Sequence, residues 1–438
     1  MIDLHGYADI GRAAAAPAVE GRLSDALGLV LEARGCNAAI GDVFEILMPG
    51  AEPVEAEVVG LRGERTLLMP LAPTYGVVSG ARLRRVGRSA RAHVGDALLG
   101  RVVDGLGRPI DGLPPPRLDA ERPLHGVMVN PLRRRAVEEP VWVGVRAIDA
   151  ALTLAKGQRI GIFAGGGVGK STLLGMMVRE SVADVAVIAL VGERGREVEE
   201  FVNRTLGEAG LAKSVVVAAT SADPPLVRVR GALYATAIAE HFRAEGRDVL
   251  LVMDSVTRYA MAMREIGLAV GEPPTTKGYT PSVFASLPRL LERAGTSTGP
   301  GSITGIYTVL VEGDDLSDPI ADAARAILDG HIVLSRELAE RGRFPAIDVP
   351  RSVSRVMTHV ASREHVGLAQ QLRETLASYR EAEDLVAVGA YRHGAVPRLD
   401  DALARMPKVE KFLRQRTDEP CAAKTTLAAL TALYKEAP

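Results

Sequence analysis

The chain has 438 residues, of which 47% are hydrophobic and 24% are charged, and its 53 Lys and Arg residues nearly balance its 54 Asp and Glu residues. This composition excludes wholesale disorder and a collagen-like or mucin-like stalk, and a general nucleic-acid coat protein would be more basic. The length is enough for about two to four domains with sizeable cores.

The N-terminus and the cysteines indicate the compartment. The chain begins Met1-Ile2-Asp3, and neither a basic region nor a continuous apolar region follows, so we expect no signal peptide. No uncharged apolar run approaches the ~20 residues of a membrane span. Cys36 and Cys421 are too far apart in sequence for a disulfide framework or a four-cysteine zinc site. The single tryptophan, Trp142, argues against an aromatic platform for single-stranded nucleic acid. We therefore predict a cytoplasmic protein with no nucleic-acid partner.

The first part of the chain predicts a β domain. Residues 1–18 include an alanine run and are expected to form a loose or helical arm. From about Arg22 to Arg88, short runs alternate apolar and polar residues, as in Phe44-Glu45-Ile46, and Gly or Pro separates the runs. Such strands predict a small β-barrel or sandwich. Five arginines between Arg82 and Arg91 lack interleaved aromatic residues, which favours a solvated last strand and linker.

Two connecting segments follow. Asp104-Gly105 and Asp111-Gly112 are turn dipeptides and predict the boundary of the next domain. The stretch Pro131–Pro140 carries three arginines, 133–135, followed by Glu138-Glu139. We interpret it as a connector whose charge run neutralises itself.

From about Gly157 to Gly313, apolar runs alternate with helical patterns. The predicted strands are Arg159–Ala164, Val185–Gly192, Ser214–Thr220, Asp248–Asp254 and Ser302–Gly313. The predicted helices are Lys170–Glu180, Gly195–Gly210, Pro224–Gly246, Ser255–Val270 and Ser282–Ala294. Strands that are apolar throughout and alternate with helices predict a mainly parallel sheet covered on both faces. The loop Gly271–Pro281 is long and proline-rich, which is typical of functional loops.

After about Ser362 the pattern is helical to the end. One apolar stripe contains Leu368, Leu372 and Leu376, and a second one ends before Pro407, which we expect to interrupt the helix. A third stripe lies near Leu430. These stripes predict a small helical domain with its own core.

Residues 164–171, Ala-Gly-Gly-Gly-Val-Gly-Lys-Ser, form a P-loop between a predicted strand and a helix. Glycines let successive backbone N–H groups point at phosphate oxygens, and the helix N-terminus adds its positive dipole end. Lys170 brings a charge to the β- and γ-phosphates, and Ser171 supplies a hydroxyl for Mg²⁺. The residues assigned to ATP binding are Ala164, Gly165, Gly166, Gly167, Val168, Gly169, Lys170, Ser171 and Thr172.

Two acidic residues end other predicted strands. Asp254 closes the run Leu250–Met253 and is predicted to belong to the Mg²⁺ shell, with a helix N-cap as the alternative role. Glu193 follows the strand ending at Gly192 and is our candidate general base. Arg194 is expected to orient Glu193 or to contact phosphate, and a solvated start to an acidic helix is the alternative for both residues.

Phosphoryl transfer also rewards an added positive charge, which an arginine from a neighbouring subunit often supplies. The candidates are Arg351 and Arg355 in Arg-Ser-Val-Ser-Arg. Spacing alone does not choose between them or exclude a structural ion pair.

Long stretches of the chain resemble the rotary-type ATPases related to the F1 catalytic subunit, and most closely the type III export ATPases. The similar stretches are 157–177, 191–201, 250–295, 307–315, 318–340 and 344–357, including GQRIGIFAGGGVGKSTLLGMM and FPAIDVPRSVSRVM. The resemblance implies an α/β fold with a RecA-like P-loop core, an N-terminal β-barrel and a C-terminal helical domain. The implied divisions are an arm over 1–18, a barrel over 19–92, an ATP-binding domain over 93–362 and a helical domain over 363–438.

The resemblance also implies residue roles. Lys170 and Ser171 bind phosphate and Mg²⁺, Glu193 is the catalytic carboxylate, and Asp254 is the Walker B acid. Arg355 corresponds to the arginine finger that reaches a neighbour's site, so it is preferred over Arg351. Non-catalytic F1-type subunits carry Gln in place of Glu193. A chain that has both Glu193 and Arg355 would therefore complete the active site at every interface of a homohexamer.

Some features depart from the F1 pattern. An F1 catalytic subunit is expected to carry an adenine-contacting aromatic residue after a Glu-His pair, and here Glu364-His365 is followed by Val366. The adenine contact therefore stays unassigned. The C-terminal domain has no acidic lever loop of the F1 kind, which favours an export ATPase over a synthase.

The resemblance predicts Mg²⁺-dependent ATP hydrolysis that energises export through the flagellar type III apparatus, at the cytoplasmic face of the inner membrane. The implied partners are a stator-like regulator binding residues 1–18, a coiled-coil stalk near the C-terminal domain, export substrates with their chaperones, and the export gate. The alternatives are an injectisome ATPase, a hexameric RNA-translocating ATPase, and a non-catalytic subunit of a mixed ring. The form of Phe163-Ala-Gly-Gly-Gly favours the flagellar branch over the injectisome.

Overall fold

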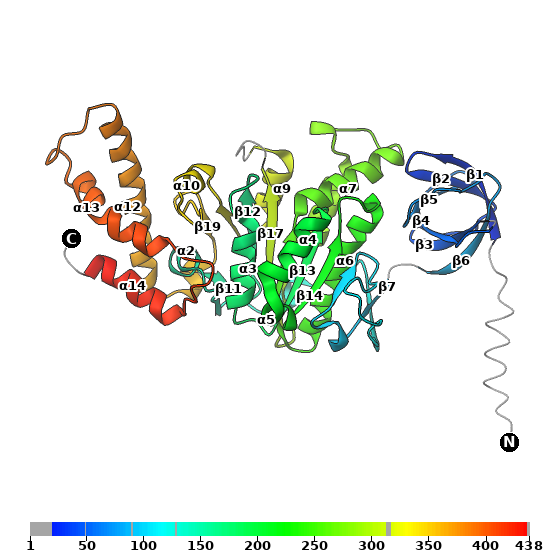
Figure 1. Cartoon of the computed structure of the whole chain (residues 1–438), viewed down its shortest axis with the longest axis horizontal. Coiled ribbons are helices and arrows are strands. Elements are labelled where there is room, and N and C mark those ends of the chain that lie inside the picture. Colours follow the sequence, from blue (N-terminus) through cyan, green and yellow to red (C-terminus); the bar gives the residue numbers. More distant parts are fainter. Residues whose placement is uncertain (1–19, 49, 89–90, 128, 312–316, 436–438) are drawn as a thin grey trace, which may run out of the picture.

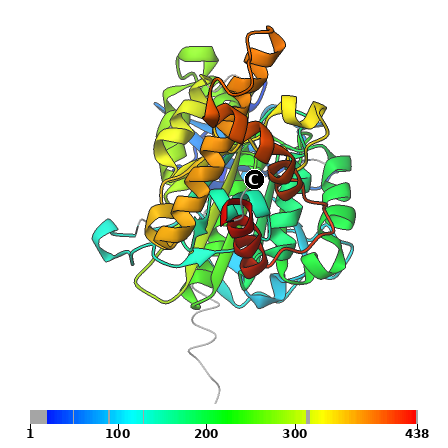
Figure 2. The same ribbon diagram turned by 90° about the vertical axis from the view of Figure 1, so that its left-hand side faces the viewer.

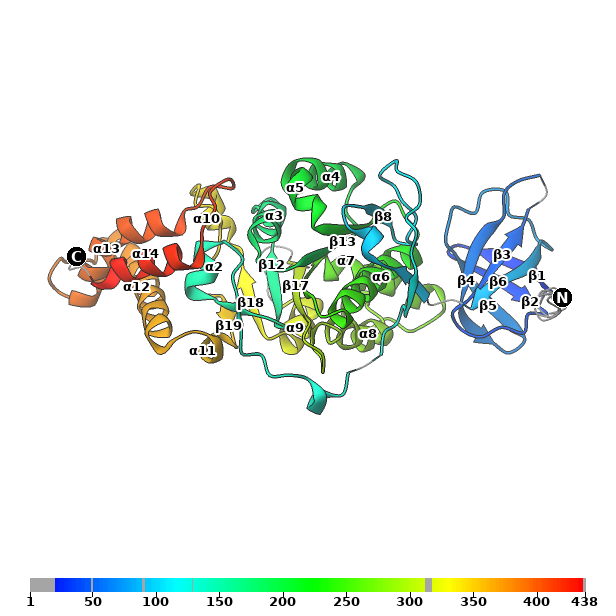
Figure 3. The ribbon, with the colours of Figure 1, turned by 90° about the horizontal axis from the view of Figure 1, so that it is seen from below.

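The computed structural model describes residues 20–48, 50–88, 91–127, 129–311 and 317–435, which form three regions in a row (Figure 1). A β-barrel lies at one end, a helix-covered sheet in the middle, and three helices at the other end, and Figure 3 gives the same order from a perpendicular direction. The predicted α/β class with its barrel and helical regions is therefore confirmed. The arm expected over residues 1–18 lies outside the described residues.

The barrel closes in the strand order β1-β2-β5-β4-β3-β6. Its strands are β1 (Glu20–Leu27), β2 (Val30–Arg34), β3 (Asp42–Leu47), β4 (Val54–Arg62), β5 (Arg65–Pro70) and β6 (Arg82–Arg88). Alternate residues such as Phe44 and Ile46 are fully buried inside it, as the alternation predicts. The predicted arginine-rich last strand is β6, where Arg85 pairs with Asp42 of β3 at 2.7 Å.

The barrel is joined to the sheet by short elements. They are β7 (Arg91–Val94), β8 (Val102–Asp104), β9 (Ala120–Pro123), β10 (Pro140–Val141), α2 (Arg146–Ala151) and β11 (Leu154–Ala155). The turn at Asp104 is confirmed, since its Oδ1 accepts 2.8 Å bonds from the N–H groups of Leu106 and Arg108. The strand β8 was missed because it is so short.

The prediction that the charges of the connector 131–140 neutralise one another is wrong for Arg134, Arg135 and Glu139. Arg134 donates to the carbonyls of Glu292 and Ala294, and Arg135 donates to the carbonyl of Gly301. Glu139 pairs instead with Lys156 at 2.8 Å. Carbonyl groups left unpaired in a neighbouring loop compete for the arginines, which sequence proximity does not reveal.

The central sheet has the order β19-β18-β12-β17-β15-β13-β14-β8, with β16 pairing beside β17. Its further strands are β12 (Arg159–Ala164), β13 (Val185–Val191), β14 (Ser214–Ala219), β15 (Asp248–Asp254), β16 (Gly295–Thr296), β17 (Ser302–Leu310), β18 (Gly330–Val333) and β19 (Val353–Ser354). All ladders along this path are parallel except that of β18 with β19. The mainly parallel sheet is therefore confirmed.

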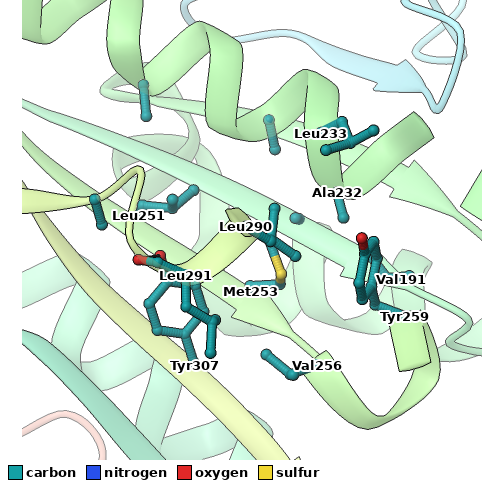
Figure 4. Close-up of a cluster of buried hydrophobic side chains, with 14 of the residues drawn as sticks. Val191, Ala232, Leu233, Leu251, Met253, Val256, Tyr259, Leu290, Leu291 and Tyr307 are labelled. Carbon is teal, nitrogen blue, oxygen red and sulfur yellow. Dashed lines mark hydrogen bonds between the residues drawn. The ribbon is translucent and has the colours of Figure 1, made fainter. Parts of the chain in front are cut away.

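Helices cover both faces of this sheet. They are α3 (Lys170–Glu180), α4 (Gly195–Glu200), a π-helical segment (Phe201–Leu206), α5 (Gly207–Ala212), α6 (Pro225–Ala244), α7 (Val256–Ala269), α8 (Pro281–Leu291), α9 (Pro319–Ile327), α10 (Arg336–Glu340) and α11 (Met357–Val360). Strand β13 serves both faces: Val187 and Ala189 join one buried cluster, and Ile188 and Leu190 join the other. Figure 4 shows side chains from α6, α7, α8, β15 and β17 meeting in the first cluster.

The parallel ladders give the sheet two distinct ends. The carboxyl end, where the parallel strands finish, holds the P-loop after β12, Glu193 after β13 and Asp254 at the last position of β15. The amino end, where the strands begin, holds Arg159 and Asp329. Chemistry-bearing residues from distant parts of the chain therefore meet at the carboxyl end.

The C-terminal region consists of α12 (Arg363–Ala387), α13 (Pro397–Leu413) and α14 (Ala423–Lys435), seen end-on in Figure 2. The expected interruption at Pro407 is wrong, because α13 continues through it. A proline inside a helix costs ~3 kcal/mol, but Met406, Val409 and Phe412 around it are buried, and each buried apolar side chain contributes about 1.5–3 kcal/mol. Among the described residues, no helix is long and apolar enough to cross a membrane.

Candidate active site

The P-loop has the backbone shape that phosphate binding requires. Gly167 and Gly169 have φ of +79° and +88°, which side-chain-bearing residues rarely adopt, and a Cβ on Gly166 or Gly167 would meet no atom within 4 Å. Open space therefore lies next to Gly166 and Gly167, and the loop lines a cleft. The helix α3 starts at Lys170, so its unpaired N–H groups face the same space.

Lys170 is held between two carboxylates. Its Nζ donates to Asp254 Oδ1 and lies 3.5 Å from Glu193 Oε1. The three side chains are only 12%, 15% and 3% exposed for Lys170, Glu193 and Asp254. Thr308 Oγ1 donates to Asp254 at 2.7 Å and fixes that carboxylate. The structure thus brings together three residues that the sequence analysis selected from three separate strand ends.

The N-cap role considered for Asp254 belongs to the next residue. Ser255 precedes α7, and its Oγ accepts from the N–H of Arg258 at 3.2 Å. Asp254 is instead the buried end of β15 and points at Lys170.

Glu193 has the protonation behaviour of a candidate base. Burial, followed by a hydrogen bond with the Glu197 carboxyl, raises the pKa of Glu193 to about 7, although the Lys170 charge opposes this rise. A base with a pKa near the working pH transfers protons efficiently.

Arg194 does not orient Glu193. It is the N-cap of α4, its side chain is 82% exposed, and its Nη1 lies 3.6 Å from Glu197 Oε1. The side chain nevertheless lines the cleft in front of the P-loop.

This cleft has a volume of about 1120 Å³ and holds more positive charge than the sequence analysis found. Its lining includes the P-loop, Glu193 and four further cationic residues, which are Arg258, Arg264, Lys277 and Arg336. Arg258 also packs against Gly192, where a Cβ would come within 2.9 Å of it. These cations complement a polyanionic ligand. They come from three separate elements, so no single sequence motif contains them.

A second cavity of about 680 Å³ opens on the other side of the P-loop helix. It shares Gly169 and Thr172 with the first cleft and is also lined by Phe344 and residues 414–419. Phe344 is 46% exposed and lies against Gly169, within 3.6 Å of where a Cβ there would be.

The Glu-His pair lies elsewhere. The His365 ring is buried against Ala150, whose carbonyl lies 2.8 Å from its Nε2, and Val366 does not line either cavity. The aromatic side chain that lines the cavity beside the P-loop helix is that of Phe344, which the sequence patterns did not single out. The exposed Phe-Pro step at 344–345 was the available signal.

Arg355 lies at the opposite end of the sheet from its own P-loop. Its N–H donates to the carbonyl of Asp329 at 3.0 Å, and Asp329 pairs with Arg159, the first residue of β12. The P-loop begins at the other end of this six-residue strand, so at ~3.3 Å per residue Arg355 is about 20 Å away from it. Arg351 is exposed on the same segment.

The donor set fits Mg²⁺ and a nucleotide together. Hard oxygen donors suit Mg²⁺. The Ser171 hydroxyl lines the cleft, and the Asp254 carboxylate lies buried beside Lys170. In the described ranges no three His, Cys, Asp or Glu residues form a cluster that would hold a metal ion. The cradle, the lysine and the cationic cleft select a nucleoside polyphosphate, and the protein is by class a P-loop nucleotide hydrolase.

Comparisons with known proteins agree. Residues 144–354 match the model of the ATP synthase alpha/beta family, nucleotide-binding domain, and residues 361–432 match the T3SS EscN ATPase C-terminal domain. The chain belongs to the ATP synthase alpha/beta family and, within it, to the ATPases of type III export systems. Its enzymatic activity is ATP hydrolysis.

Three relatives illustrate the range of names. The flagellum-specific ATP synthase of Pseudomonas aeruginosa is 51% identical, and the match covers 98% of this chain and 96% of the relative. The protein of the same name in Bacillus subtilis is 50% identical, with 94% of each chain covered. A type 3 secretion system ATPase of Xanthomonas euvesicatoria is 49% identical, with 95% of this chain and 94% of the relative covered.

Solved structures agree with the fold. The assembled ATPase EscN of enteropathogenic E. coli superimposes with a TM-score of 0.90 at 46% identity, covering 94% of this chain and 99% of that one. EscN in complex with its central stalk EscO gives a TM-score of 0.87 at 45% identity, with the same coverage.

Proposed function

We propose that this chain is the Mg²⁺-dependent ATPase of a flagellar export apparatus and that it works as a homohexamer with its sites between subunits. The observation that carries the catalytic part is the convergence of Lys170, Glu193 and Asp254 at the carboxyl end of the sheet. The observation that supports the assembly is the position of Arg355 at the other end.

The residues take the following roles. Lys170 leaves its carboxylate partners to bind the β- and γ-phosphates, and the P-loop N–H groups from Ala164 to Thr172 surround them. Ser171 and Asp254 would hold Mg²⁺, which would supply positive charge beside the phosphate oxygens. Glu193, released from Lys170, orients a water molecule and accepts its proton. Arg194 lies at the rim and contacts outer phosphate oxygens.

Arg355 serves the site of a neighbouring chain. A side chain ~20 Å from its own P-loop cannot reach it, since an arginine extends only a few ångströms from its Cα. In a ring, the amino end of one sheet would face the carboxyl end of the next, and the guanidinium would stabilise the charge on the transferred phosphoryl group.

The adenine base occupies the second cavity. Phosphates at the start of α3 leave the nucleoside to extend over Gly169, and Phe344 offers an exposed ring for stacking there. The remaining wall comes from the segment 414–419, next to α13.

The flagellar assignment is supported by the names of the relatives, and the injectisome assignment is the second candidate because an injectisome-type relative is nearly as similar. Either way, hydrolysis would energise unfolding of export substrates, release of their chaperones and delivery to an inner-membrane gate. The assembly also includes two further partners. A stator-like regulator binds residues 1–18, and a coiled-coil stalk lies near the C-terminal helices. We keep the domain divisions at 19–92, 93–362 and 363–438 as a proposal.

Two experiments test this. The Mg-ATPase rate per chain, measured against protein concentration, should rise steeply as rings assemble, and a flat rate down to concentrations where only monomers are detected would contradict an inter-chain site. Deletion of the gene in its own organism should abolish export of flagellar filament protein and swimming. Normal swimming with loss of another type III export activity would favour the injectisome.

A further inference from the structure

The segment that carries Arg355 is built to present it outward. Over Arg351–Arg355, exposed and buried side chains alternate, and the buried ones are Ser352 and Ser354. Ser352 Oγ accepts from the N–H of Val333 at 2.9 Å, and Ser354 Oγ donates to the carbonyl of Thr153 at 2.9 Å. The two serines therefore fix the inward side of the segment to the core, and the arginines face solvent.

A side chain from the C-terminal helices also forms hydrogen bonds to this segment. Arg373 lies on α12, and its Nη1 donates to the carbonyls of Ser352 at 2.8 Å and of Val349 at 3.0 Å. Its Nη2 donates to the carbonyl of Ala151 at 3.0 Å, next to the core. One guanidinium thus joins three parts of the molecule, and one of its acceptors is three residues from Arg355. Figures 1 and 3 both place α12 beside the β19 edge of the sheet.

The charge environment of Arg373 is unusual. Burial lowers the pKa of this arginine, and within the described residues no carboxylate pairs with it. A partly buried cation bound only by carbonyl groups is poor evidence for a contribution to stability, because apolar residues of similar volume often serve as well or better. Its planar fork does, however, fix the relative position of three carbonyls, which no apolar side chain can do.

We propose that Arg373 is a positioning residue for Arg355 and that it couples the C-terminal helical region to the active site of the neighbouring chain. When α12 shifts, the carbonyls of Ser352 and Val349 shift with it, and the arginine that these residues support moves relative to the neighbour's phosphates. A movement of the C-terminal helices thereby changes the rate of ATP hydrolysis in the neighbouring chain and not only in the same chain. This inference rests on the proposed role of Arg355 in trans.

The test uses rings mixed from two kinds of full-length chain. Acceptor chains carry Arg355→Ala and keep an intact P-loop, and donor chains carry Lys170→Ala and keep Arg355. Only an interface between an acceptor site and a donor arginine hydrolyses ATP. Arg373→Met is then placed either in the donor or in the acceptor, and Arg398→Met, which removes an exposed arginine paired with Glu381, is the matched control.

We expect Arg373→Met in the donor to lower the restored kcat by about 10- to 100-fold, the range for displacement of a catalytic group by about 1 Å. The same change in the acceptor should have an effect at least tenfold smaller, and KM for ATP should stay within about twofold in both cases. Arg398→Met should have no effect in either chain. Arg373→Lys, which keeps the charge without the fork, should give a partial loss in the donor and covers the case in which Arg373→Met does not fold.

Equal losses in donor and acceptor, or no loss in either with Arg373→Met and Arg373→Lys, would overturn the coupling. If the donor and acceptor chains without further changes restore no activity although mixed rings form, the proposed role of Arg355 fails instead. The two failures are thus distinguishable.

Discussion

The two ends of the central sheet treat their charged residues in opposite ways. At the carboxyl end, Lys170, Glu193 and Asp254 are nearly buried, and the lysine pairs with both carboxylates. At the amino end, Arg159 is paired with Asp329, whereas the exposed Arg355 guanidinium has no carboxylate within ion-pair distance among the described residues. The contrast supports the proposal that each chain keeps most of a site at one end of its sheet and supplies the missing positive charge to a neighbour from the other end.

Removing the amino-end arginine should have the largest effect. Arg355→Ala is expected to lower kcat by ~10³-fold or more, because the transition-state charge loses its partner, whereas nucleotide binding survives. Steady-state kinetics and nucleotide titration measure both quantities. Arg351→Ala, on the same exposed face, is the control and should retain turnover. An equal loss of binding in Arg355→Ala would assign it a structural role.

At the carboxyl end, Glu193→Gln should bind Mg-ATP normally but lose turnover by at least ~100-fold, since the amide cannot accept the proton of water. A filter-binding or fluorescence titration next to an ATPase assay separates the two effects. Glu199→Gln, an exposed change on helix α4, which follows Glu193, serves as the control. Turnover within a few-fold of the unchanged chain would rule out Glu193 as the base.

Substitution of Phe344 should give a smaller effect, and on binding. Phe344→Ala is expected to raise KM for ATP by roughly 10-fold, the scale of one base–aromatic stacking contact, with little change in kcat. Phe344→Tyr should restore the normal KM because the ring is kept. A normal KM in Phe344→Ala would place the base outside the second cavity.

The smallest effect concerns pH. The Glu193 carboxyl has a pKa raised to about 7, so its protonated fraction grows as the pH falls through 7, and the protonated form cannot act as a base. We expect kcat to fall between pH 7.5 and about pH 6, approaching tenfold per pH unit at the acid end. The residual activity of Glu193→Gln should lack this step. A profile that is the same in both chains would assign the step to another group.

Much of the carboxyl end was predictable from sequence, because parallel strands finish at the same end and carry their following residues together. Lys170, Glu193 and Asp254 were found in this way. Arg355 was not chosen by spacing, since Arg351 shares its exposed face, and only the family resemblance preferred it. The two serines alternate with the other residues of this segment in the sequence, but this pattern does not show which arginine reaches a phosphate.

The rest depends on tertiary packing. Phe344 reaches Gly169, and Arg373 reaches Ser352, only because distant segments fold back on the P-loop helix and on β19. Helix α13 passes Pro407 because its neighbours are buried, against the local preference. In such contacts, many possible partners from distant segments compete for the same side chain. A local sequence pattern does not include those partners and therefore cannot predict the contact.

The division of the site between two chains is tested most directly by mixing Lys170→Ala with Arg355→Ala. Each chain alone should be almost inactive. In mixed rings, the intact P-loop of one chain meets the intact arginine of the other, and we predict a rate well above the sum of the two separate rates. A mixture that forms rings but shows only that sum would contradict the account.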